Sequence, residues 1–190
     1  MAVTTAEQTH ALAAALGAVL EAGDLLVLTG ELGAGKTTFA QGVGEGLGVR
    51  GGIISPTFVL VRIHPNRPEG TRPGGPDLVH VDAYRLESAR EIDGIDLENT
   101  LDTAVTVVEW GRGRVEHLSG SRLDVELHRA IGTGDMGTGE IGIGGSTTDQ
   151  DGTLDFDTSD NDEPRTIVLR GFGPRWAEQP MLTGRTGGKF

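Results

Sequence analysis

The chain has 190 residues, no cysteine, 28 acidic against 16 basic residues, and 31 glycines, about one residue in six. Nine acids and no base lie in residues 131–164, so the net charge of −12 falls to −3 over the rest of the chain. The lack of cysteine excludes disulfides and cysteine-based metal or nucleophile chemistry, and no apolar run approaches the ~20 residues of a transmembrane helix. Outside residues 131–164 the chain is nearly neutral, so its net charge gives no electrostatic attraction to DNA. Since the first ten residues also lack the features of a secretion signal, we expect a soluble, cytoplasmic protein without a membrane or DNA partner.

The first predicted elements are a helix, a buried strand and a second helix. Thr4-Thr5-Ala6-Glu7 is typical of a capping box, and it opens a helix whose apolar residues share one face: Leu12, Leu16, Val19 and Leu20. Residues 25–29 (LLVLT) are wholly apolar except for the threonine, as in a buried parallel strand. Phe39, Val43 and Leu47 recur every four residues and predict the second helix. Glycines at 42, 44 and 46 would each weaken that helix by ~1 kcal/mol, so packing must hold it.

Strands and short helices alternate through the rest of the chain. Residues 57–64, 78–81 and 105–108 read as strands, and 86–103 as one or two short helices broken at Gly94. The proline-rich segment 65–76 is expected to be a surface loop. Residues 121–128 and 165–170 alternate in polarity and predict an antiparallel hairpin.

This order of elements predicts an α/β fold, with a mostly parallel sheet flanked by helices and an antiparallel edge hairpin. We expect one domain over residues 1–178. The acidic, glycine-rich residues 131–164 are predicted to be a disordered insertion at the hairpin tip. Residues 179–190 are predicted to be a disordered tail.

A phosphate-binding loop is the strongest functional motif. Residues 30–37 (GELGAGKT) match G-x4-G-K-[ST] between the predicted strand and helix. Glycines let backbone N–H groups turn toward phosphate oxygens, and the helix that follows points its positive end at the same anion. The motif predicts that Lys36 reaches the β- and γ-phosphates and that the Thr37 hydroxyl ligates Mg²⁺. The expected nucleotide-binding residues are Gly30, Glu31, Leu32, Gly33, Ala34, Gly35, Lys36, Thr37 and Thr38.

Two acids are candidates for the other half of such a site. Asp82 ends the strand LVHVD and Glu109 ends AVTVVE, and ligands of open α/β sheets bind at the carboxyl ends of the strands. Phosphoryl transfer needs a carboxylate for Mg²⁺ and a group that orients the attacking water. Asp82 and Glu109 are therefore, with Lys36, the candidate catalytic residues, and with Thr37 the candidate metal ligands. The alternative for each acid is a solvated residue at a strand end.

Several neighbouring residues admit two interpretations. Ser55-Pro56-Thr57 is either a turn that enters a strand or a switch segment in which Thr57 senses Mg²⁺ or the γ-phosphate. His80 alternates with Asp82 and either orients that carboxylate or fills the core. Trp110 is expected in the core rather than in a binding surface. The chain lacks an N-K-x-D motif for guanine, so ATP is the expected nucleotide.

Taken together, these motifs resemble one family. GELGAGKTTFAQG, SPTF, HVDAYRL and EWG, in this order and spacing, are similar to the TsaE (YjeE) family of bacterial ATPases in tRNA threonylcarbamoyladenosine biosynthesis. The resemblance covers about residues 5–130. It implies a P-loop NTPase fold, weak ATPase activity with Mg²⁺, TsaB- and TsaD-type partners, and tRNA reached only through the complex.

The resemblance also implies roles for particular residues. Lys36 and Thr37 take the phosphate and magnesium roles, Glu109 is the expected Walker B-like magnesium acid, and Asp82 is expected at the metal or the attacking water. Which acid lies closer to the water stays open. Gly111 and Arg112 depart from the proline and acid that often follow Glu-Trp in the family.

Two other functions use the same loop. A small-molecule kinase would need an arginine-bearing lid, for which residues 65–76, with Arg67 and Arg72, are the candidate. A non-catalytic module would use ATP only to order the switch segment.

Overall fold

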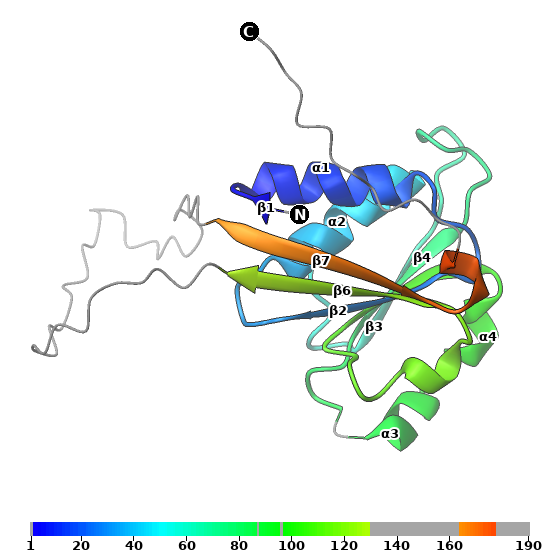
Figure 1. Cartoon of the computed structure of the whole chain (residues 1–190). Helices are drawn as coiled ribbons and strands as arrows, with labels where there is room; N and C mark the ends of the chain where they lie inside the picture. The colour runs from blue at the N-terminus through cyan, green and yellow to red at the C-terminus, as the bar shows by residue number, and fades with distance from the viewer. Residues whose placement is uncertain (1, 87, 96, 130–163, 178–190) are drawn as a thin grey trace, which may run out of the picture.

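A seven-stranded sheet with helices on both faces forms the protein (Figure 1). The structure is a computed structural model that describes residues 2–86, 88–95, 97–129 and 164–177. The predicted tail 179–190 therefore lies outside the described residues, as does all of the predicted insertion 131–164 except Pro164.

The strand order is β1-β7-β6-β2-β5-β4-β3. β6, β2, β5 and β4 run parallel, and the pairs β1–β7, β7–β6 and β4–β3 are antiparallel. This confirms the predicted α/β fold with its edge hairpin and adds a second antiparallel edge at β3. The strands are β1 (Ala2–Val3), β2 (Leu25–Gly30), β3 (Val61–His64), β4 (Asp77–Asp82), β5 (Ala104–Glu109), β6 (Arg122–Arg129) and β7 (Arg165–Phe172).

Helices α1 (Ala6–Gly17) and α2 (Lys36–Leu47) cover one face of the sheet, and the short helices α3 (Ala89–Asp93) and α4 (Glu98–Leu101) lie on the other (Figure 1). Two 3₁₀ turns follow, at Glu116–Leu118 and Pro174–Trp176. The first four residues of the central strand β2 are apolar because Leu26 and Leu28 pack toward α1 and α2 while Leu25 and Val27 pack on the opposite face.

Helix α1 is capped by Thr5, one residue after the first threonine of the predicted capping box, and it ends before Val19 and Leu20, which the apolar spacing had included. The Thr5 hydroxyl accepts a hydrogen bond from the backbone N–H of Gln8. The helix ends at Gly17, so Val19 lies beyond it and is 54% exposed, although the apolar spacing had placed it on the buried face. Leu16 and Leu20 are buried as predicted.

The glycines of α2 allow close packing against α1. A Cβ on Gly46 would lie 2.1 Å from the carbonyl oxygen of Ala14, and one on Gly42 would lie 2.4 Å from that of His10. Larger residues would therefore push the two helices apart. The contact with α1 explains why the sequence accepts the loss of helix propensity.

The strand predicted at 57–64 is shorter in the structure. The Pro56 carbonyl accepts hydrogen bonds from Val59 N–H (2.9 Å) and Leu60 N–H (2.7 Å), so the chain turns here before β3 begins at Val61. Leu60 has a φ of +66°, and Phe58 is 90% exposed. The turn initiated at Pro56 overrides the β propensity of the residues after it.

The proline-rich loop 65–76 packs against the carboxyl end of α2. Arg67 N–H donates to the Gly48 carbonyl (3.1 Å), Asn66 donates to the Leu47 carbonyl (2.8 Å), and Arg72 donates to the Leu20 carbonyl. The phosphate loop precedes the amino end of the same helix, about 18 Å away for 12 residues. The loop is therefore not placed as a lid over the phosphate loop.

An ion pair holds the last described turn. Arg175 pairs with the buried Asp24 (3.0 and 3.1 Å) and so joins the turn after β7 to the start of β2.

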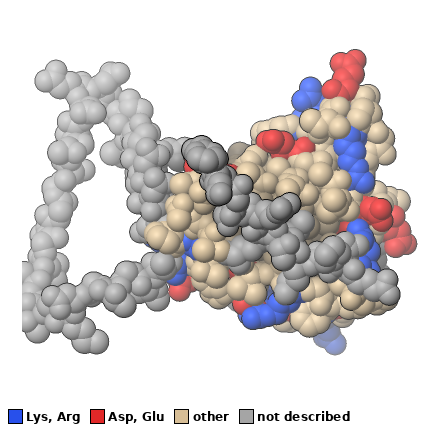
Figure 2. Space-filling model, turned by 45° about the horizontal axis from the view of Figure 1, so that its top comes forward, with Lys and Arg blue, Asp and Glu red and all other residues tan. Residues whose placement is uncertain are grey.

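On the face drawn in Figure 2, basic and acidic side chains are interspersed and separated by uncharged surface. Within the described ranges, none of the helices is long and apolar enough to cross a bilayer.

Candidate functional site

The phosphate loop joins the end of β2 to the start of α2, as predicted. Gly30 passes so close to β6 that a Cβ there would lie 2.5 Å from the Leu127 carbonyl oxygen. Gly35, the residue before α2, has a φ of +95° and no side chain that could cap the helix. The first N–H groups of α2 are therefore left for an acceptor outside the helix, and with the helix dipole they suit an anion.

Lys36 is folded back onto this loop. Its Nζ donates to the carbonyls of Gly30 (2.9 Å) and Glu31 (2.8 Å) and lies 3.8 Å from the centre of the Trp110 ring. Burial lowers the pKa of Lys36, while the nearby carboxylates of Glu109 and Asp82 act in the opposite direction. The ammonium thus contacts two neutral carbonyl oxygens, which phosphate oxygens would replace in a nucleotide complex.

Thr37 and Glu109 connect the loop to strand β5. The Thr37 hydroxyl donates to Glu109 Oε1 (3.0 Å), with Oε2 at 3.3 Å. Glu109 is buried, and its Oε1 lies 2.9 Å from Nε2 of the buried His80 on β4. The hydroxyl and the carboxylate predicted as metal ligands therefore lie in contact.

Asp82 lies beside Glu109 and holds the predicted switch segment. The two acids are register partners at the carboxyl ends of β4 and β5. Asp82 Oδ2 accepts hydrogen bonds from the hydroxyls of Ser55 (3.1 Å) and Thr57 (2.5 Å), and Oδ1 accepts one from Tyr84 N–H (2.9 Å). Pro56 between the two hydroxyl residues is buried. Residues 55–57 thus form the predicted turn before β3 and also contact Asp82.

The remaining loop residues divide by exposure. Glu31 and Gly33 are exposed and Leu32 is 86% exposed, whereas Ala34 is buried. Thr38 is half-buried in the first turn of α2. These positions leave the backbone, rather than the side chains of residues 31–34, as the feature available to a phosphate.

The oxygen donors present suit Mg²⁺, which protein sites hold with one or two carboxylates completed by phosphate and water. Thr37, Glu109 and Asp82 supply a hydroxyl and two carboxylates. The structure shows no group of three or more His, Asp or Glu side chains arranged for a metal among the residues that it describes. A magnesium ion here would accordingly need oxygens from a bound nucleotide.

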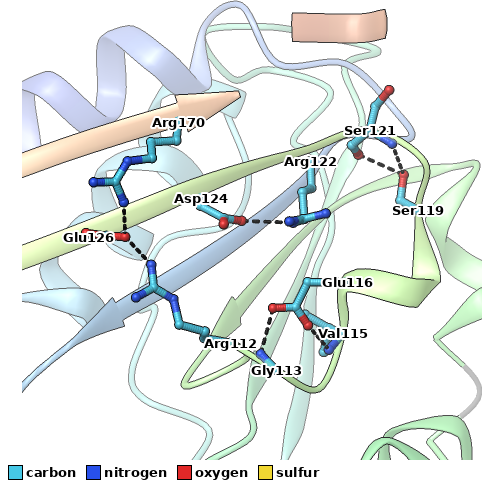
Figure 3. A network of polar contacts seen from close by, with 10 residues as sticks. All are labelled: Arg112, Gly113, Val115, Glu116, Ser119, Ser121, Arg122, Asp124, Glu126 and Arg170. Carbon is cyan, nitrogen blue, oxygen red and sulfur yellow. Dashed lines mark hydrogen bonds and ion pairs between the residues drawn. The ribbon is translucent and has the colours of Figure 1, made fainter. Parts of the chain in front are cut away.

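A salt-bridge cluster lies next to the loop on the other side of β2. Glu126 is the register partner of Thr29, the residue before Gly30. Its carboxylate receives both Arg112, from the loop after β5, and Arg170, from β7 (Figure 3). The hydrogen bond from Arg112 is the largest cause of the lowered pKa of Glu126, against the opposing effect of burial. The cluster fixes the loop that follows Glu109 and Trp110.

His80 is a buried core histidine, which is one of its two predicted interpretations, but Trp110 lies outside the core and Arg114 had no signal in the sequence. His80 contacts Glu109 rather than Asp82, because it faces the neighbouring strand diagonally, where Val107 is its register partner. Trp110 lies over Lys36 and against Tyr84 (ring centres 5.2 Å apart) instead of in the core. Arg114 donates to the carbonyls of Ala83 (2.8 Å) and Trp110 (3.1 Å), joining the loops after the two acids.

Comparison with known proteins identifies the family. The model of the family "Threonylcarbamoyl adenosine biosynthesis protein TsaE" matches residues 3–139. A Streptomyces coelicolor protein named tRNA threonylcarbamoyladenosine biosynthesis protein TsaE is 45% identical over 163 residues, 85% of this chain and 89% of that protein. The Mycobacterium tuberculosis H37Rv protein of the same name is 50% identical over 129 residues, 65% of this chain and 74% of that protein.

A solved structure shows the same fold. The crystal structure of Bacillus subtilis YdiB aligns with a TM-score of 0.55 and 27% identity, covering 92% of this chain and 85% of that chain. The strand–loop–helix site and the strand order agree with a P-loop NTPase fold. With the family model matching most of its length, this chain belongs to the TsaE family.

Proposed function

We propose that this chain binds ATP with Mg²⁺, hydrolyses it slowly, and serves in the cytoplasm as an accessory protein of the complex that forms N6-threonylcarbamoyladenosine in tRNA. Its proposed partners are TsaB- and TsaD-type proteins, and tRNA is reached only through them. The names of its relatives support the pathway. The hydrogen bond from Thr37 to Glu109 supports the nucleotide site, because it joins the phosphate loop to an acid at a strand end.

In this proposal Lys36 exchanges the two carbonyls that it now contacts for phosphate oxygens. The N–H groups at the start of α2 donate to the same anion. Bound Mg²⁺ would neutralise charge on the phosphates. The Thr37 hydroxyl keeps a lone pair for the metal while its hydrogen points to Glu109.

The contacts of the two acids suggest different roles. Glu109 lies against Thr37 and so belongs on the metal side. Asp82 is held by Ser55 and Thr57, and we assign it to the attacking water and to the response of the switch segment. Of the alternatives, the small-molecule kinase is less well supported. Residues 65–76, which were its candidate lid, pack at the end of α2 that is far from the phosphate loop.

ATP hydrolysis by the full chain, alone and with a TsaB–TsaD pair, tests the proposal. We expect slow turnover that rises with the pair. Lys36→Ala should weaken ATP binding about 10–100-fold, because a charged hydrogen-bond donor is lost. Glu109→Gln should lower hydrolysis by roughly 10²-fold while sparing nucleotide affinity.

Lys189→Ala is the matched control, because it removes the other lysine of the chain. It should leave binding and turnover unchanged. Tight ATP binding with turnover that the pair does not alter would favour the nucleotide-gated binding module. Absence of ATP binding would refute the proposal.

A further inference from the structure

Among the described residues, the buried ring of His80 has one hydrogen-bond partner at Nε2 and none at Nδ1. It lies in β4 between Val79 and Val81, and its side chain is fully buried. Nε2 lies 2.9 Å from Glu109 Oε1. Nδ1 has no hydrogen-bond partner among the described residues. A histidine that merely filled the core could be replaced by an apolar residue without leaving a carboxylate unsatisfied.

These contacts assign the ring proton. An ionised carboxylate only accepts hydrogen bonds, so the contact with Glu109 requires the N–H at Nε2. A proton on Nδ1 would be buried without an acceptor, which is unfavourable. The contact therefore places an N–H donor at Nε2, directed at Glu109 Oε1.

The Nε2–H donor restrains Glu109 from the side of the sheet. Oε1 of this buried carboxylate also accepts the hydrogen bond from Thr37 at the start of α2. One oxygen is thus fixed by a strand and by a helix, and the orientation of Oε2 follows from it. Without His80, Thr37 would be the remaining contact that orients the carboxylate, and Glu109 could turn away from the metal position.

We propose that His80 is a positioning residue, which orients the Glu109 carboxylate against Thr37 for magnesium binding. The inference rests on the proposed ATPase function and assigns a residue beyond its phosphate loop and acids. Partners of this kind typically contribute 10–100-fold to metal affinity or activity.

The ring proton can be located without nucleotide. A long-range ¹H–¹⁵N correlation spectrum of the metal-free full chain distinguishes a protonated ring nitrogen from a bare one. The signals of His80 are those, among the five histidines, that disappear in His80→Gln. We expect a proton on Nε2, and an Nε2 without a proton would overturn the inference.

Substitutions then test the effect on magnesium. The amide nitrogen of His80→Gln reaches about as far as Nε2, whereas that of His80→Asn lies near the position of Nδ1. We expect His80→Gln to hydrolyse ATP with nearly the wild-type magnesium requirement, and His80→Asn and His80→Leu to need about tenfold more magnesium. ATP affinity measured with EDTA should change less than twofold in all three.

His64→Leu is the matched control. His64 is also buried, its ring centre lies 6.3 Å from that of His80, and its Nε2 likewise lacks a partner among the described residues. Its substitution should leave the magnesium requirement unchanged. If His64→Leu and His80→Leu act equally, or if Gln restores no more than Asn, the inference fails. If the wild-type chain binds no ATP, the proposed function fails first and the inference fails with it.

Discussion

At the scale of single residues, the contact between Lys36 and Trp110 provides a test of the proposed nucleotide binding. The Lys36 ammonium lies 3.8 Å from the centre of the Trp110 ring, a cation–π contact that depends on the lysine staying folded back. A phosphate oxygen offers the lysine a stronger, charge-assisted hydrogen bond than the two carbonyls do. Binding of a nucleotide should therefore move the charge off the ring.

We predict that ATP changes the fluorescence of Trp110. Trp176→Phe leaves Trp110 as the single tryptophan of the chain, and ATP should then give a saturable change in emission. The same titration of Lys36→Ala in this background should show little change, because no cation leaves the ring. A signal that persists in Trp110→Phe, with Trp176 retained, would contradict this assignment.

The pairing of Asp82 with Glu109 was predictable from the sequence, because both end apolar strands and parallel strands end at one edge. The contact of His80 was not, since it depends on which strands are neighbours and on a diagonal across them. The half-buried position of Trp110 over Lys36 was missed for a related reason. Its φ of +60° turns it away from the strand that it follows, and sequence periodicity does not report such a reversal.

At the scale of elements, the cluster around Glu126 links three segments: β6, β7 and the loop after β5. Both arginines are about half exposed, with 51% of the Arg112 side chain and 54% of the Arg170 side chain accessible. Solvent screening reduces the stabilisation accordingly. We expect Glu126→Gln to lower the free energy of unfolding at pH 7 by about 1–2 kcal/mol.

The pH dependence of this loss follows from the direction of the pKa shift. The pKa of Glu126 is lowered in the folded chain from the 4.5 of an unperturbed glutamate. Its contribution is therefore fully present above pH 4.5 and is lost as the pH falls through the folded-state pKa. Urea unfolding of the wild type and Glu126→Gln should differ at pH 7, and the difference should shrink below pH 4.5.

A double-mutant cycle separates this cluster from general packing effects. Arg170→Ala should cost less stability in the Glu126→Gln background than in the wild type, because its ionic partner is already gone. Equal costs in the two backgrounds, or a difference between wild type and Glu126→Gln that does not shrink below pH 4.5, would argue against the assigned contact.

At the scale of the whole molecule, the sequence was most informative where one local rule decides the structure. The phosphate loop, the apolar strand β2 and the hairpin of β6 and β7 agree with their patterns. It was least informative at contacts between distant segments. The pairing of β1 with β7 and the ion pair of Arg175 with Asp24 bring together residues more than 140 positions apart, and neither has a local pattern.

The ends of the edge hairpin provide a test of the fold as a whole. Arg129 and Arg165 are register partners, so the last residue of β6 lies opposite the first of β7. The 35 residues between them include the acidic segment, and they connect two strand ends that are already adjacent. A two-residue Asn-Gly turn spans such a gap in an antiparallel hairpin.

Replacing residues 130–164 by Asn-Gly should therefore preserve folding and ATP binding. A shorter loop loses less entropy when it closes, by about 0.6 kcal/mol for each halving of length, so the variant should be up to about 2.5 kcal/mol more stable. Thermal unfolding and the ATP titration of Trp110 fluorescence, both at matched ionic strength, measure the two properties. A lower melting temperature would mean that the replaced segment contributes to the packing of the domain. Unchanged stability with altered ATP affinity would mean instead that its nine acids act on the nucleotide site through charge.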